Sequence, residues 1–470
     1  MHGPIYLTED IRRIEQGFAE AAPPLMERAG AAAAATAARL ASERGKDILV
    51  LAGPGNNGGD ARVLAERLKE QFFRVSVISR PEELAERSWA LVVDGLFGIG
   101  LARELEGDYV ALVDYVNRQR CPVLALDIPS GIHADSGRAM GRAVRATHTI
   151  TFIALKPGLL TLDGPDHCGE VSVATLELEL HHKFGASGWV ASPRLFAEAL
   201  RRRPRNFHKG MAGSVGILGG AAGMTGAAIL AGRGALKLGA GRVYVGLIEE
   251  ETVKLDYGHP ELMLRHADDV LGQELHALVA GPGLGDGERA ETLLGAALAS
   301  DIPCVIDADA LNLISESEDL RKACARRSAD TLLTPHPAEA ARLLACTVAE
   351  VQHDRVKAAK ILADNLTANV VLKGNGSVIV ARDGHWFINA TGNPGMASAG
   401  MGDALCGILG ALLAQRYSGE SSLVLGVHLH GAAGDALAKE GIGPVGMTAN
   451  ELIDAARRIW NGWLMEGTAR

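Results

Sequence analysis

The chain has 470 residues, more than one hydrophobic core usually serves, and we therefore expect two domains. Hydrophobic residues make up 47% and charged residues 22% of the chain, proportions typical of a folded globular protein and not of a disordered or fibrous one. The net charge of -9 argues against a nucleic-acid surface, and we expect no nucleic-acid partner.

Neither a membrane span nor a secretory leader is expected. No apolar run approaches the roughly 20 residues that a bilayer span needs. The N-terminus carries Glu9 and Asp10 in place of the basic and then apolar pattern of a signal peptide. The six cysteines are scattered, without a Cys-x-x-Cys pair. We expect reduced thiols, a cytoplasmic location and no membrane partner.

The first half of the chain alternates short apolar runs with helical stretches. We expect strands at residues 48–52, 75–78, 91–93, 123–126, 149–154 and 170–176. Because these runs lack period-two alternation, they predict a parallel sheet that is covered by helices on both faces. Ligand sites in such a sheet lie at the carboxyl ends of the strands. An alanine-rich helix is expected at 31–38, and its flanks are expected to contact a second copy in a homo-oligomer.

A glycine-rich turn follows the first of these strands. Gly53, Gly55 and Gly58 match the dinucleotide fingerprint G-x-G-x-x-G, ahead of a helix that we expect at residues 61–69. The Asn-Asn-Gly-Gly-Asp string at residues 56–60 adds polar side chains at the start of that helix, which favours a polar ligand or a cation. Arg80 follows the next strand, where a 2′-phosphate would lie. A purely structural glycine turn is the alternative.

Two later strands also end in polar turns. Asp94 follows the strand at 91–93, and Asp127 and Ser130 follow the strand at 123–126. Taken singly, each Asp is a candidate helix cap or turn former. Together with Asn57 they bring oxygen ligands to one edge of the sheet, which predicts a site for a monovalent cation. Lys156, after the fifth strand, is either an assistant in proton transfer or a surface cation at a strand end.

Charged and small residues between 181 and 205 interrupt the pattern, and we expect domains at residues 1–190 and 191–470. A second α/β series follows, with strands expected at 214–218, 243–247, 277–280, 303–306, 331–333 and 370–372. The Asp383-Gly384 turn predicts a hairpin of residues 378–381 with 385–388.

A glycine-rich segment at residues 389–403 leads into an apolar helix expected at 404–415. Backbone amides at the start of such a helix form an anion site, and the chain has no Walker A sequence to hold phosphates in another way. Asp403 is a candidate N-terminal cap, but a carboxylate beside an anion site is also placed to take a proton from an attacking hydroxyl. We predict a phosphoryl-transfer site with Asp403 as its base.

Other polar strings of the second half are expected at the same sheet edge, at residues 206–210, 281–285, 307–312, 334–339 and 373–377. His336 lies between two prolines, which favours a fixed ligand contact over a structural role. The last string offers a cation and backbone amides to a diphosphate, and an ordinary turn is the alternative. That string consists of Lys373, Gly374, Asn375, Gly376 and Ser377.

The first-half motifs at residues 56–60, 94–101 and 127–131 resemble those of the NAD(P)H-hydrate epimerase family, which interconverts the two C6 epimers of hydrated nicotinamide cofactors. The resemblance implies a Rossmann-like three-layer domain, K⁺ bound by Asn57, Asp94 and Ser130, and Asp127 as an acid or base. The family usually has a further Gly where this chain has Ala61. The residues implied to hold the hydrated dinucleotide are Asn56, Asn57, Gly58, Gly59, Asp60, Gly98, Ile99, Gly100, Leu101, Ala102, Arg103, Glu104 and Asp127.

The second-half motifs, spread over residues 208–415, resemble the ADP- or ATP-dependent NAD(P)H-hydrate dehydratase family of the ribokinase-like group. The resemblance implies that Lys373, Gly374, Asn375, Gly376, Ser377 and Gly402 bind the adenine nucleotide. It also implies that Ala227, Gly283, His336 and Asp403 contact the hydrate.

The implied reaction is phosphorylation of the C6 hydroxyl, with Mg²⁺ and ADP as cofactors and Asp403 as the base, followed by elimination that restores NADH or NADPH. Only one epimer fits a chiral site, and the epimerase half supplies it. Together the two halves resemble a bifunctional NAD(P)H-hydrate repair family.

Three other functions fit parts of the sequence. A nicotinamide-dependent dehydrogenase would use the turn at 53–58 but leaves the turn ending at Asp403 unexplained. A ribokinase-like small-alcohol kinase fused to a dinucleotide-binding domain would not need the Asn-Asn-Gly-Gly-Asp string. A nucleotide sensor without catalysis would tolerate the loss of Asp403. The sequence does not distinguish NADHX from NADPHX as substrate, or ADP from ATP as donor.

Overall fold

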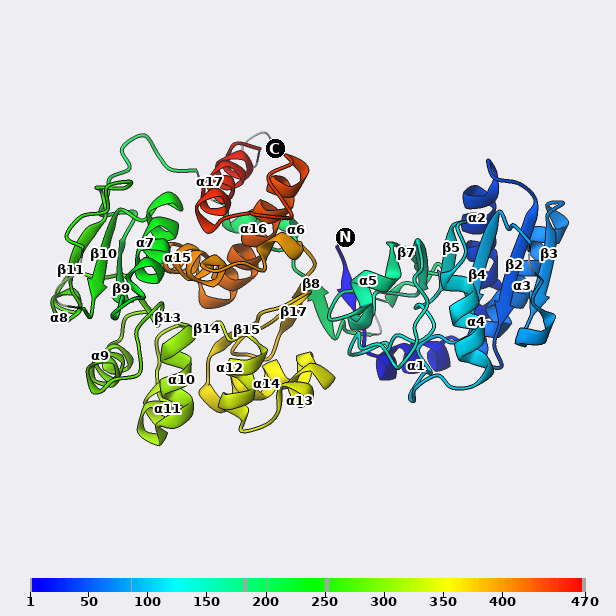
Figure 1. Ribbon diagram of the computed structural model, residues 1–470, viewed down its shortest axis with the longest axis horizontal. Helices are drawn as coiled ribbons and strands as arrows, with labels where there is room; N and C mark the ends of the chain where they lie inside the picture. The colour runs from blue at the N-terminus through cyan, green and yellow to red at the C-terminus, as the bar shows by residue number, and fades with distance from the viewer. Residues whose placement is uncertain (1, 86, 181–183, 201, 250–252, 467–470) are drawn as a thin grey trace. The chain divides into compact units, whose positions relative to one another are not determined.

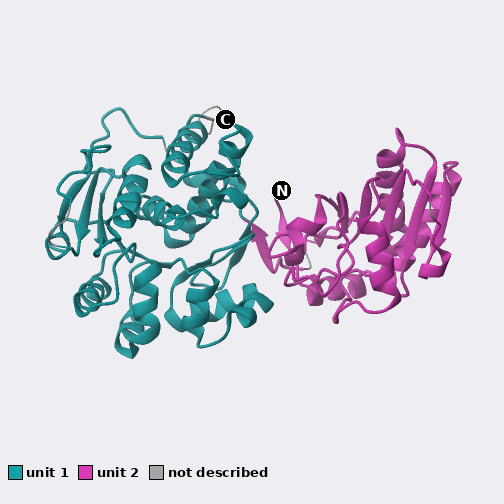
Figure 2. Ribbon diagram, viewed as in Figure 1, with its two compact units in different colours: residues 1, 191–470 teal, residues 2–190 magenta. Residues whose placement is uncertain are grey.

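The computed structural model describes the chain except residues 1, 86, 181–183, 201, 250–252 and 467–470 (Figure 1). The described chain divides into two compact units, residues 2–190 and the residues from 191 onward (Figure 2). Each unit has its own sheet and its own hydrophobic core, and each is described by itself below.

The unit of residues 2–190 is built on a parallel sheet with the strand order β3-β2-β4-β5-β6-β7. The central strands β2, β4 and β5 are buried along almost their whole length, as their apolar sequences require. The short strands β1 (Pro4–Ile5) and β8 (Gly188–Val190) pair with each other in antiparallel fashion. The six strands of the sheet are β2 (Asp47–Ala52), β3 (Arg74–Ile78), β4 (Leu91–Gly95), β5 (Val123–Leu126), β6 (His148–Phe152) and β7 (Glu170–Ala174).

Helices cover both faces of this sheet. One core forms between the sheet and α1, α2 and α3, and a second forms between the sheet and α4. The small residues of α2 let it lie close to α3, since a methyl group at Gly30 would come within 2.4 Å of Val63 Cγ1. The helices are α1 (Thr8–Gly17), α2 (Leu25–Ala41), α3 (Asn56–Glu70), α4 (Asp108–Asn117) and the short α5 (Gly164–Cys168).

The second unit contains a larger sheet, whose strands run in the order β17-β16-β15-β14-β13-β12-β9-β10-β11. The strands from β15 to β11 are parallel, and β16 and β17 form an antiparallel hairpin at one side. The strands are β9 (Ser214–Gly219), β10 (Arg242–Leu247), β11 (Met263–His266), β12 (Ala277–Ala280), β13 (Cys304–Ile306), β14 (Thr331–Leu333), β15 (Asn369–Leu372), β16 (Ser377–Val380) and β17 (Trp386–Asn389).

One face of this sheet carries α7 (Thr225–Lys237), α15 (Met401–Ala414), α16 (Gly419–Lys439) and α17 (Ala449–Glu466), and these helices and the sheet form the main core (Figure 1). The other face carries the helices between β12 and β15 (Figure 1). They are α9 (Glu288–Ala299), α10 (Ala308–Glu316), α11 (Glu318–Ala325), α12 (Pro337–Leu344), α13 (Val348–His353) and α14 (Arg355–Leu366). The short helices α6 (Pro193–Phe196) and α8 (Ala267–Val270) complete the unit.

Helices α7 and α15 pack side by side and run in the same direction. Gly400 lies at the start of α15 next to Leu230, and Gln415 at its end donates a hydrogen bond to the carbonyl of Leu238. Gly407 allows this approach, because a methyl group there would lie 2.0 Å from the carbonyl oxygen of Ala231. The close contact therefore places the glycine-rich turn before α15 beside α7.

The predicted α/β class is confirmed, with mostly parallel sheets in both units. The strand β11 was not predicted, because its sequence Met-Leu-Arg-His ends in two exposed polar residues. The helix expected at 61–69 begins earlier, at Asn56, so the Asn-Asn-Gly-Gly-Asp string is helical. All six cysteines are free thiols. Among the described helices, none combines the length and the apolar character needed to cross a bilayer.

Candidate active sites

A cavity of about 310 Å³ opens at the carboxyl edge of the sheet in residues 2–190. Its wall is made by α1, the start of α3, the turns after β4 and β5, and the segment after β6. Of the predicted binding residues, those that line it are Asn56, Asn57, Asp60, Gly98, Ile99, Gly100 and Asp127. The lining does not include Gly58, Gly59, Leu101, Ala102, Arg103 or Glu104.

Asp127 and Lys156 form a buried ion pair in the wall of this cavity. The Lys156 ammonium donates to Asp127 Oδ1 at 2.5 Å, to Thr151 Oγ1 at 2.8 Å and to the carbonyl oxygen of Phe152 at 2.7 Å. The other carboxylate oxygen of Asp127 accepts from the backbone amide of Ile99. The side chain of Lys156 is only 1% exposed. The alternative reading of Lys156 as a surface cation is therefore wrong.

The three residues predicted to bind a cation come from neighbouring elements at the same sheet edge: Asn57 lies in the first turn of α3, Asp94 near the end of β4, and Ser130 after β5. Asp94 is fully buried, and its carboxylate accepts from the Ser130 hydroxyl at 2.6 Å and from the Ser130 amide at 2.8 Å. Burial raises the pKa of Asp94, and the hydrogen bonds from Ser130 oppose that shift. Asn57 is 7% exposed, and neither its amide oxygen nor its amide nitrogen has a hydrogen-bond partner among the described residues.

Asp60 is a second carboxyl group in this cavity, and it lacks a cation of its own. It is 9% exposed, and no described residue donates a hydrogen bond to its carboxyl oxygens. Burial, Asp127 and Glu15 raise its pKa to about 8, while Lys156 acts in the opposite direction. Glu15 comes from α1 and was not predicted, because only the tertiary fold brings that helix to the cavity.

Gly58 has a packing role in the Asn-Asn-Gly-Gly-Asp string. A methyl group at Gly58 would lie 1.9 Å from the carbonyl oxygen of Gly53, whereas one at Gly55 would have no atom within 4 Å. We expect Gly58→Ala to destabilise this unit by about 1–3 kcal/mol through overpacking and Gly55→Ala to leave its stability nearly unchanged. Thermal unfolding of the two variants checks this. Equal melting temperatures would contradict the packing role.

The replacement of the usual glycine by Ala61 does not alter the cavity wall. Ala61 is fully buried, and its methyl group faces β4, where a side chain at Gly95 would come within 2.5 Å of it. Arg62 points away from the cavity and donates to the carbonyl oxygen of Gly53 at 3.2 Å. The shape of the pocket is therefore set by other residues.

The second candidate site lies at the carboxyl edge of the parallel strands in the other unit. Asp307 follows β13, and Lys373 follows β15. The two strands lie on either side of β14, so the topology brings their ends close together. Lys373 Nζ donates to Asp307 Oδ1 at 2.8 Å, and it lies 4.0 Å from Glu339 Oε2.

The charged form of Asp307 is stabilised by several neighbouring residues. Its side chain is 3% exposed, and Cys406 Sγ donates to Asp307 Oδ2. Burial alone would raise the pKa of Asp307, but the Lys373 ammonium and the hydrogen bonds from Lys373, Thr334 and Cys406 outweigh burial and lower it. Asp307 was predicted to lie at this edge without a role, and pairing with Lys373 is its observed one.

Asp403 lies in the first turn of α15, at the same edge. No described residue donates a hydrogen bond to its carboxylate. Burial and the nearby charges of Asp307 and Asp309 raise the pKa of Asp403 to about 6, and Lys373 partly offsets them. Gly402 lies close to both members of the Lys373–Asp307 pair, because a methyl group there would be in ordinary contact at 3.4 Å from Lys373 Nζ and 3.5 Å from Asp307 Oδ2. The structure therefore gathers Asp403, Gly402 and Lys373, as predicted for a phosphoryl site.

Arg355 supports the predicted nucleotide-binding turn at residues 373–377 through hydrogen bonds to backbone carbonyl groups. Arg355 is 1% exposed and donates to the carbonyl oxygens of Leu372 and Lys373. Gly374 has a left-handed φ of 143°, and a methyl group there would lie 2.8 Å from Arg355 Nη1. Ser377 closes the turn by donating to the carbonyl oxygen of Gly374. Arg355 was missed because nothing in its local sequence distinguishes it from a surface arginine on a helix.

Gly283 packs against the segment just before α7, the helix that carries Ala227. Ala227 lies in the first turn of α7, and the Ala221 amide just before that helix donates to the carbonyl oxygen of Gly283 at 2.7 Å. A methyl group at Gly283 would lie 2.6 Å from the carbonyl oxygen of Met224. Both residues thus belong to one surface at the start of α7.

His336 has a structural role that the sequence analysis did not predict. Its Nδ1 accepts hydrogen bonds from the amides of Ala338 and Glu339, so it caps the start of α12. Its Nε2 lies 3.1 Å from Glu339 Oε1, and the side chain is 48% exposed. Burial and the charge of Lys373 lower the pKa of His336. An Nδ1 that accepts from amides requires the neutral tautomer with the proton on Nε2.

The prediction that residues 206–210 lie at the ligand edge is wrong. This segment precedes β9, and a methyl group at Gly241, just before β10, would lie 1.9 Å from the carbonyl oxygen of Lys209. The segment is therefore at the amino ends of β9 and β10. In a parallel sheet, the residues before a strand lie at the edge opposite to the residues after it.

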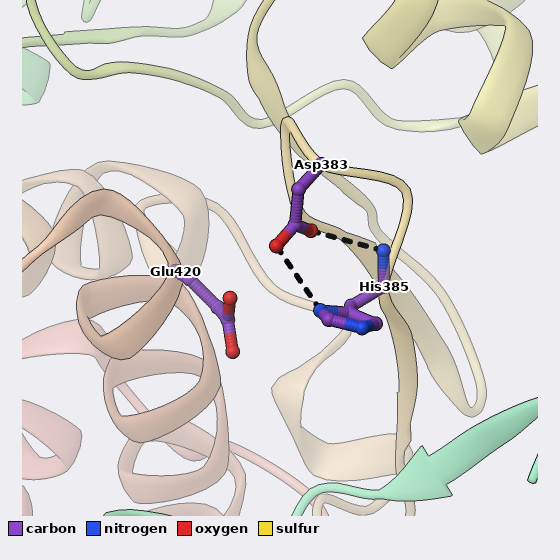
Figure 3. A group of neighbouring side chains, drawn as sticks. All are labelled: Asp383, His385 and Glu420. Atoms are coloured by element: carbon purple, nitrogen blue, oxygen red, sulfur yellow. Dashed lines mark hydrogen bonds and ion pairs between the residues drawn. The ribbon is translucent and has the colours of Figure 1, made fainter.

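One further cluster could be mistaken for the metal site of this unit. Asp383, His385 and Glu420 are the group of His, Cys, Asp or Glu side chains close enough to hold a metal ion within the described part of the chain (Figure 3). His385 Nδ1 lies 3.1 Å from Asp383 Oδ2, and both side chains are exposed. Glu420 lies in the first turn of α16, where the helix dipole disfavours a cation. The cluster closes the β16–β17 turn, at the opposite end of the hairpin from Ser377.

Both units match known protein families. The family described as NAD(P)H-hydrate dehydratase matches residues 215–458. The family described as YjeF-related protein N-terminus matches residues 23–90 and 80–158. A crystal structure of the ADP/ATP-dependent NAD(P)H-hydrate dehydratase from Bacillus subtilis, co-crystallised with ATP and Mg²⁺, is 29% identical, with a TM-score of 0.51 over 58% of this chain and 98% of that chain.

A ribokinase-like superfamily protein from Enterococcus faecalis is 26% identical, with a TM-score of 0.50 over 58% of this chain and 95% of its own. Among curated proteins, the bifunctional NAD(P)H-hydrate repair enzyme of Coxiella burnetii is 38% identical over 97% of this chain and 99% of its own length. The unit from residue 191 onward therefore has a ribokinase-like fold. With both family matches in one continuous chain, this protein belongs to the bifunctional NAD(P)H-hydrate repair enzymes.

Proposed function

We propose that residues 191–470 catalyse the ADP-dependent dehydration of S-NAD(P)HX, and that residues 1–190 interconvert its R and S epimers. The observation that carries the first assignment is the environment of Asp403. This carboxylate has no described hydrogen-bond partner, has a pKa raised to about 6, and stands at the start of α15 across from Lys373. A general base is most effective when its pKa lies near the working pH.

Each residue of this site has a separate role in the proposed phosphoryl transfer. Asp403 takes the proton of the C6 hydroxyl while that oxygen attacks the terminal phosphorus of the nucleotide. Lys373, held by Asp307, and the amides of the turn 374–377 bind the phosphates. The ring nitrogen of the nicotinamide then expels phosphate, and loss of the C5 proton restores the double bond between C5 and C6. Ala227, Gly283 and His336 contact the nicotinamide in this proposal.

The charges of the second site support a role for Mg²⁺. Asp307 and Glu339 lie within 4.0 Å of the Lys373 ammonium, and Asp403 is near the charges of Asp307, Asp309 and Lys373. Because a polyphosphate is repelled by so many carboxylates, a divalent cation bound with it supplies the missing positive charge. Asp309 is the residue that would hold the cation, directly or through water, since Asp307 is already paired with Lys373 and Asp403 is assigned as the base.

The first cavity fits K⁺ by its donor set. Asn57 Oδ1 is buried without a hydrogen-bond partner, and the buried Asp94 carboxylate forms no ion pair with any described residue. Both groups, and the Ser130 hydroxyl, are hard oxygen ligands without a competing thiol or imidazole. A cation held there screens the charge of Asp94 and fixes the turn after β4, which lines the cavity.

Two expectations about the whole chain belong to the same proposal. All six cysteines are free thiols, which supports a reducing compartment such as the cytoplasm. The expected homo-oligomer would have to use the outer side of α2, because Ala29, Gly30, Ala33, Ala34, Ala37 and Ala41 are buried within the unit.

The test uses each purified epimer separately. With ADP and Mg²⁺, we expect the S epimer to recover its reduced-nicotinamide absorbance at once, and the R epimer to recover it through prior conversion to S. Without nucleotide, the epimers should equilibrate and no absorbance should return. Failure to recover either epimer with ADP or ATP would show the proposal to be wrong, and phosphorylation of a small alcohol would favour the kinase alternative.

The same assay tests the proposed potassium site. We expect epimerisation to slow by roughly tenfold when K⁺ is replaced by choline, the loss of about 1.5 kcal/mol from one charged contact. Asn57→Ala should show the slower rate in both salts, and the exposed control Asn461→Ala should respond to K⁺ like the unaltered chain. A rate that is independent of K⁺ in the unaltered chain would contradict the site.

A further inference from the structure

Two of the three acidic groups that line the cavity of residues 2–190, Asp60 and Asp127, have different surroundings. Asp127 is paired with the Lys156 ammonium at 2.5 Å and accepts a further bond from the Ile99 amide. Asp60 lines the same cavity, is buried, and has neither a cation partner nor a described hydrogen-bond donor. Two carboxyl groups of one site with such different surroundings suit opposite roles, one giving a proton and the other taking it.

The helix α1 adds a third carboxyl group to the cavity. Glu15 and Arg12 of α1 both line it, and they lie before residue 23, where the match to the epimerase-type family begins. Glu15 is half-buried. Its negative charge favours the protonated form of Asp60. Glu15 is therefore placed to keep a proton on Asp60 without itself needing to reach the reacting carbon.

We propose that Asp60 is the proton donor that works opposite the Asp127–Lys156 pair in this cavity, and that Glu15 is a positioning residue that keeps Asp60 protonated. This inference rests on the proposed epimerase function of the unit. It adds a second acid–base group to the site and gives a function to α1.

The proposed step is balanced as follows. Asp60 gives its proton to the C6 hydroxyl oxygen, and the C6–O bond breaks so that its electron pair leaves with the oxygen as water. The lone pair of the adjacent ring nitrogen forms a double bond to C6. Water then adds to the other face of C6, its electron pair forms the new C6–O bond, and its proton passes to the Asp127 carboxylate. Proton exchange with solvent then removes the proton from Asp127 and returns one to Asp60, which restores the starting state. The reverse epimerisation exchanges the two roles, and no oxidation or reduction occurs.

The pH dependence follows from the groups that face Asp60. Glu15 from α1 and Asp127 from the end of β5 favour its protonated form, and Lys156 from the segment after β6 opposes them. The donor must be protonated, so the epimerisation rate should fall as the pH rises above about 8. Removing the charge of Glu15 lowers the pKa of Asp60, which moves this loss of activity to lower pH.

The experiment follows conversion of pure R epimer to S by chromatography, in the full-length protein without nucleotide, after subtraction of the spontaneous rate. We expect Asp60→Asn to lose at least roughly a hundredfold in rate, the usual range for a general acid. Glu15→Gln should keep its epimerisation activity at low pH. As the pH is raised, its activity should fall at a lower pH than that of the unaltered chain. Dehydration of pure S epimer with ADP, measured on the same samples, should be unchanged in both variants.

Asp60→Asn with a rate near that of the unaltered chain would overturn the proposal, and so would a Glu15→Gln profile whose alkaline loss does not move or moves to higher pH. If Asp60→Asn unfolds its unit, the Glu15→Gln profile alone decides. If the unaltered chain fails to epimerise at all, the proposed function of the unit is wrong, an outcome distinct from a wrong choice of proton donor.

Discussion

Replacing Asp403 with Asn is expected to lower the rate of S-NAD(P)HX dehydration by about 10²–10⁴-fold, the usual contribution of a general base. The substitution keeps the size of the side chain and removes its ability to take a proton. Epimerisation in the other unit should be unaffected. The measurement is recovery of reduced-nicotinamide absorbance from pure S epimer under saturating ADP and Mg²⁺. The exposed Asp301→Asn is the matched control and should keep full activity.

The pH dependence of this reaction gives an independent check. The base must be unprotonated, and the pKa of Asp403 is raised to about 6, so the dehydration rate should rise with pH through about 6 and then level off. A folded-state pKa above the ordinary value means that the charged form costs stability at neutral pH. Asp403→Asn should therefore raise the melting temperature of its unit at pH 7 and change it little near pH 4. A variant that keeps its dehydration rate would show that another group is the base.

Replacing Lys156 with Met should destabilise the unit of residues 2–190 by more than Gly58→Ala does. Breaking a buried ion pair by removal of one partner costs about 3–5 kcal/mol, because the remaining charge is left buried without compensation. Lys156 also supplies hydrogen bonds to Thr151 and Phe152, which the Met side chain cannot make. Epimerisation should fall at the same time, since the Asp127 carboxylate loses the group that holds it.

Amide hydrogen exchange in the full-length protein measures this loss of stability within the unit of residues 2–190. The amides of β5 and β6 should exchange at least roughly a hundredfold faster in Lys156→Met, the equivalent of about 3 kcal/mol. Lys69→Met is the control, because its pair with Glu66 is exposed and such pairs contribute little. The double variant Lys156→Met/Asp127→Asn should recover part of the lost protection. Unchanged exchange in Lys156→Met would contradict the energetic importance of the pair.

Local sequence patterns were sufficient for the parallel strands and for the turns that follow them. Apolar runs such as the one at β12 are buried on both faces of the sheet. Polar residues that follow a strand directly in the sequence do lie at the carboxyl edge of the sheet. The same rule, applied to residues 206–210, failed because that segment comes before its strand and so lies at the other edge. β11 was missed because an edge strand with exposed residues carries no apolar signal.

The candidate sites were harder to predict where they depend on contacts between distant parts of the chain. Lys373 was recognised from its glycine-rich turn, but its partner Asp307, 66 residues away, follows only from the strand order. Arg355 and Glu15 have no local motif, and each acquires its role from packing against a different segment. His336 was predicted as a ligand contact, and its additional role in capping α12, where its ring accepts hydrogen bonds from backbone amides, was not predicted.

Burial of one carboxyl group in each unit has a consequence for how the two activities combine. In the proposed reactions, Asp60 must keep its proton, which holds below about pH 8, and Asp403 must have lost its proton, which holds above about pH 6. The two reactions in series therefore share an optimum between these limits, centred near neutrality. At more acidic pH the second reaction becomes rate-limiting and both epimers remain at their equilibrium ratio, whereas at more alkaline pH the first becomes rate-limiting and R epimer is left behind.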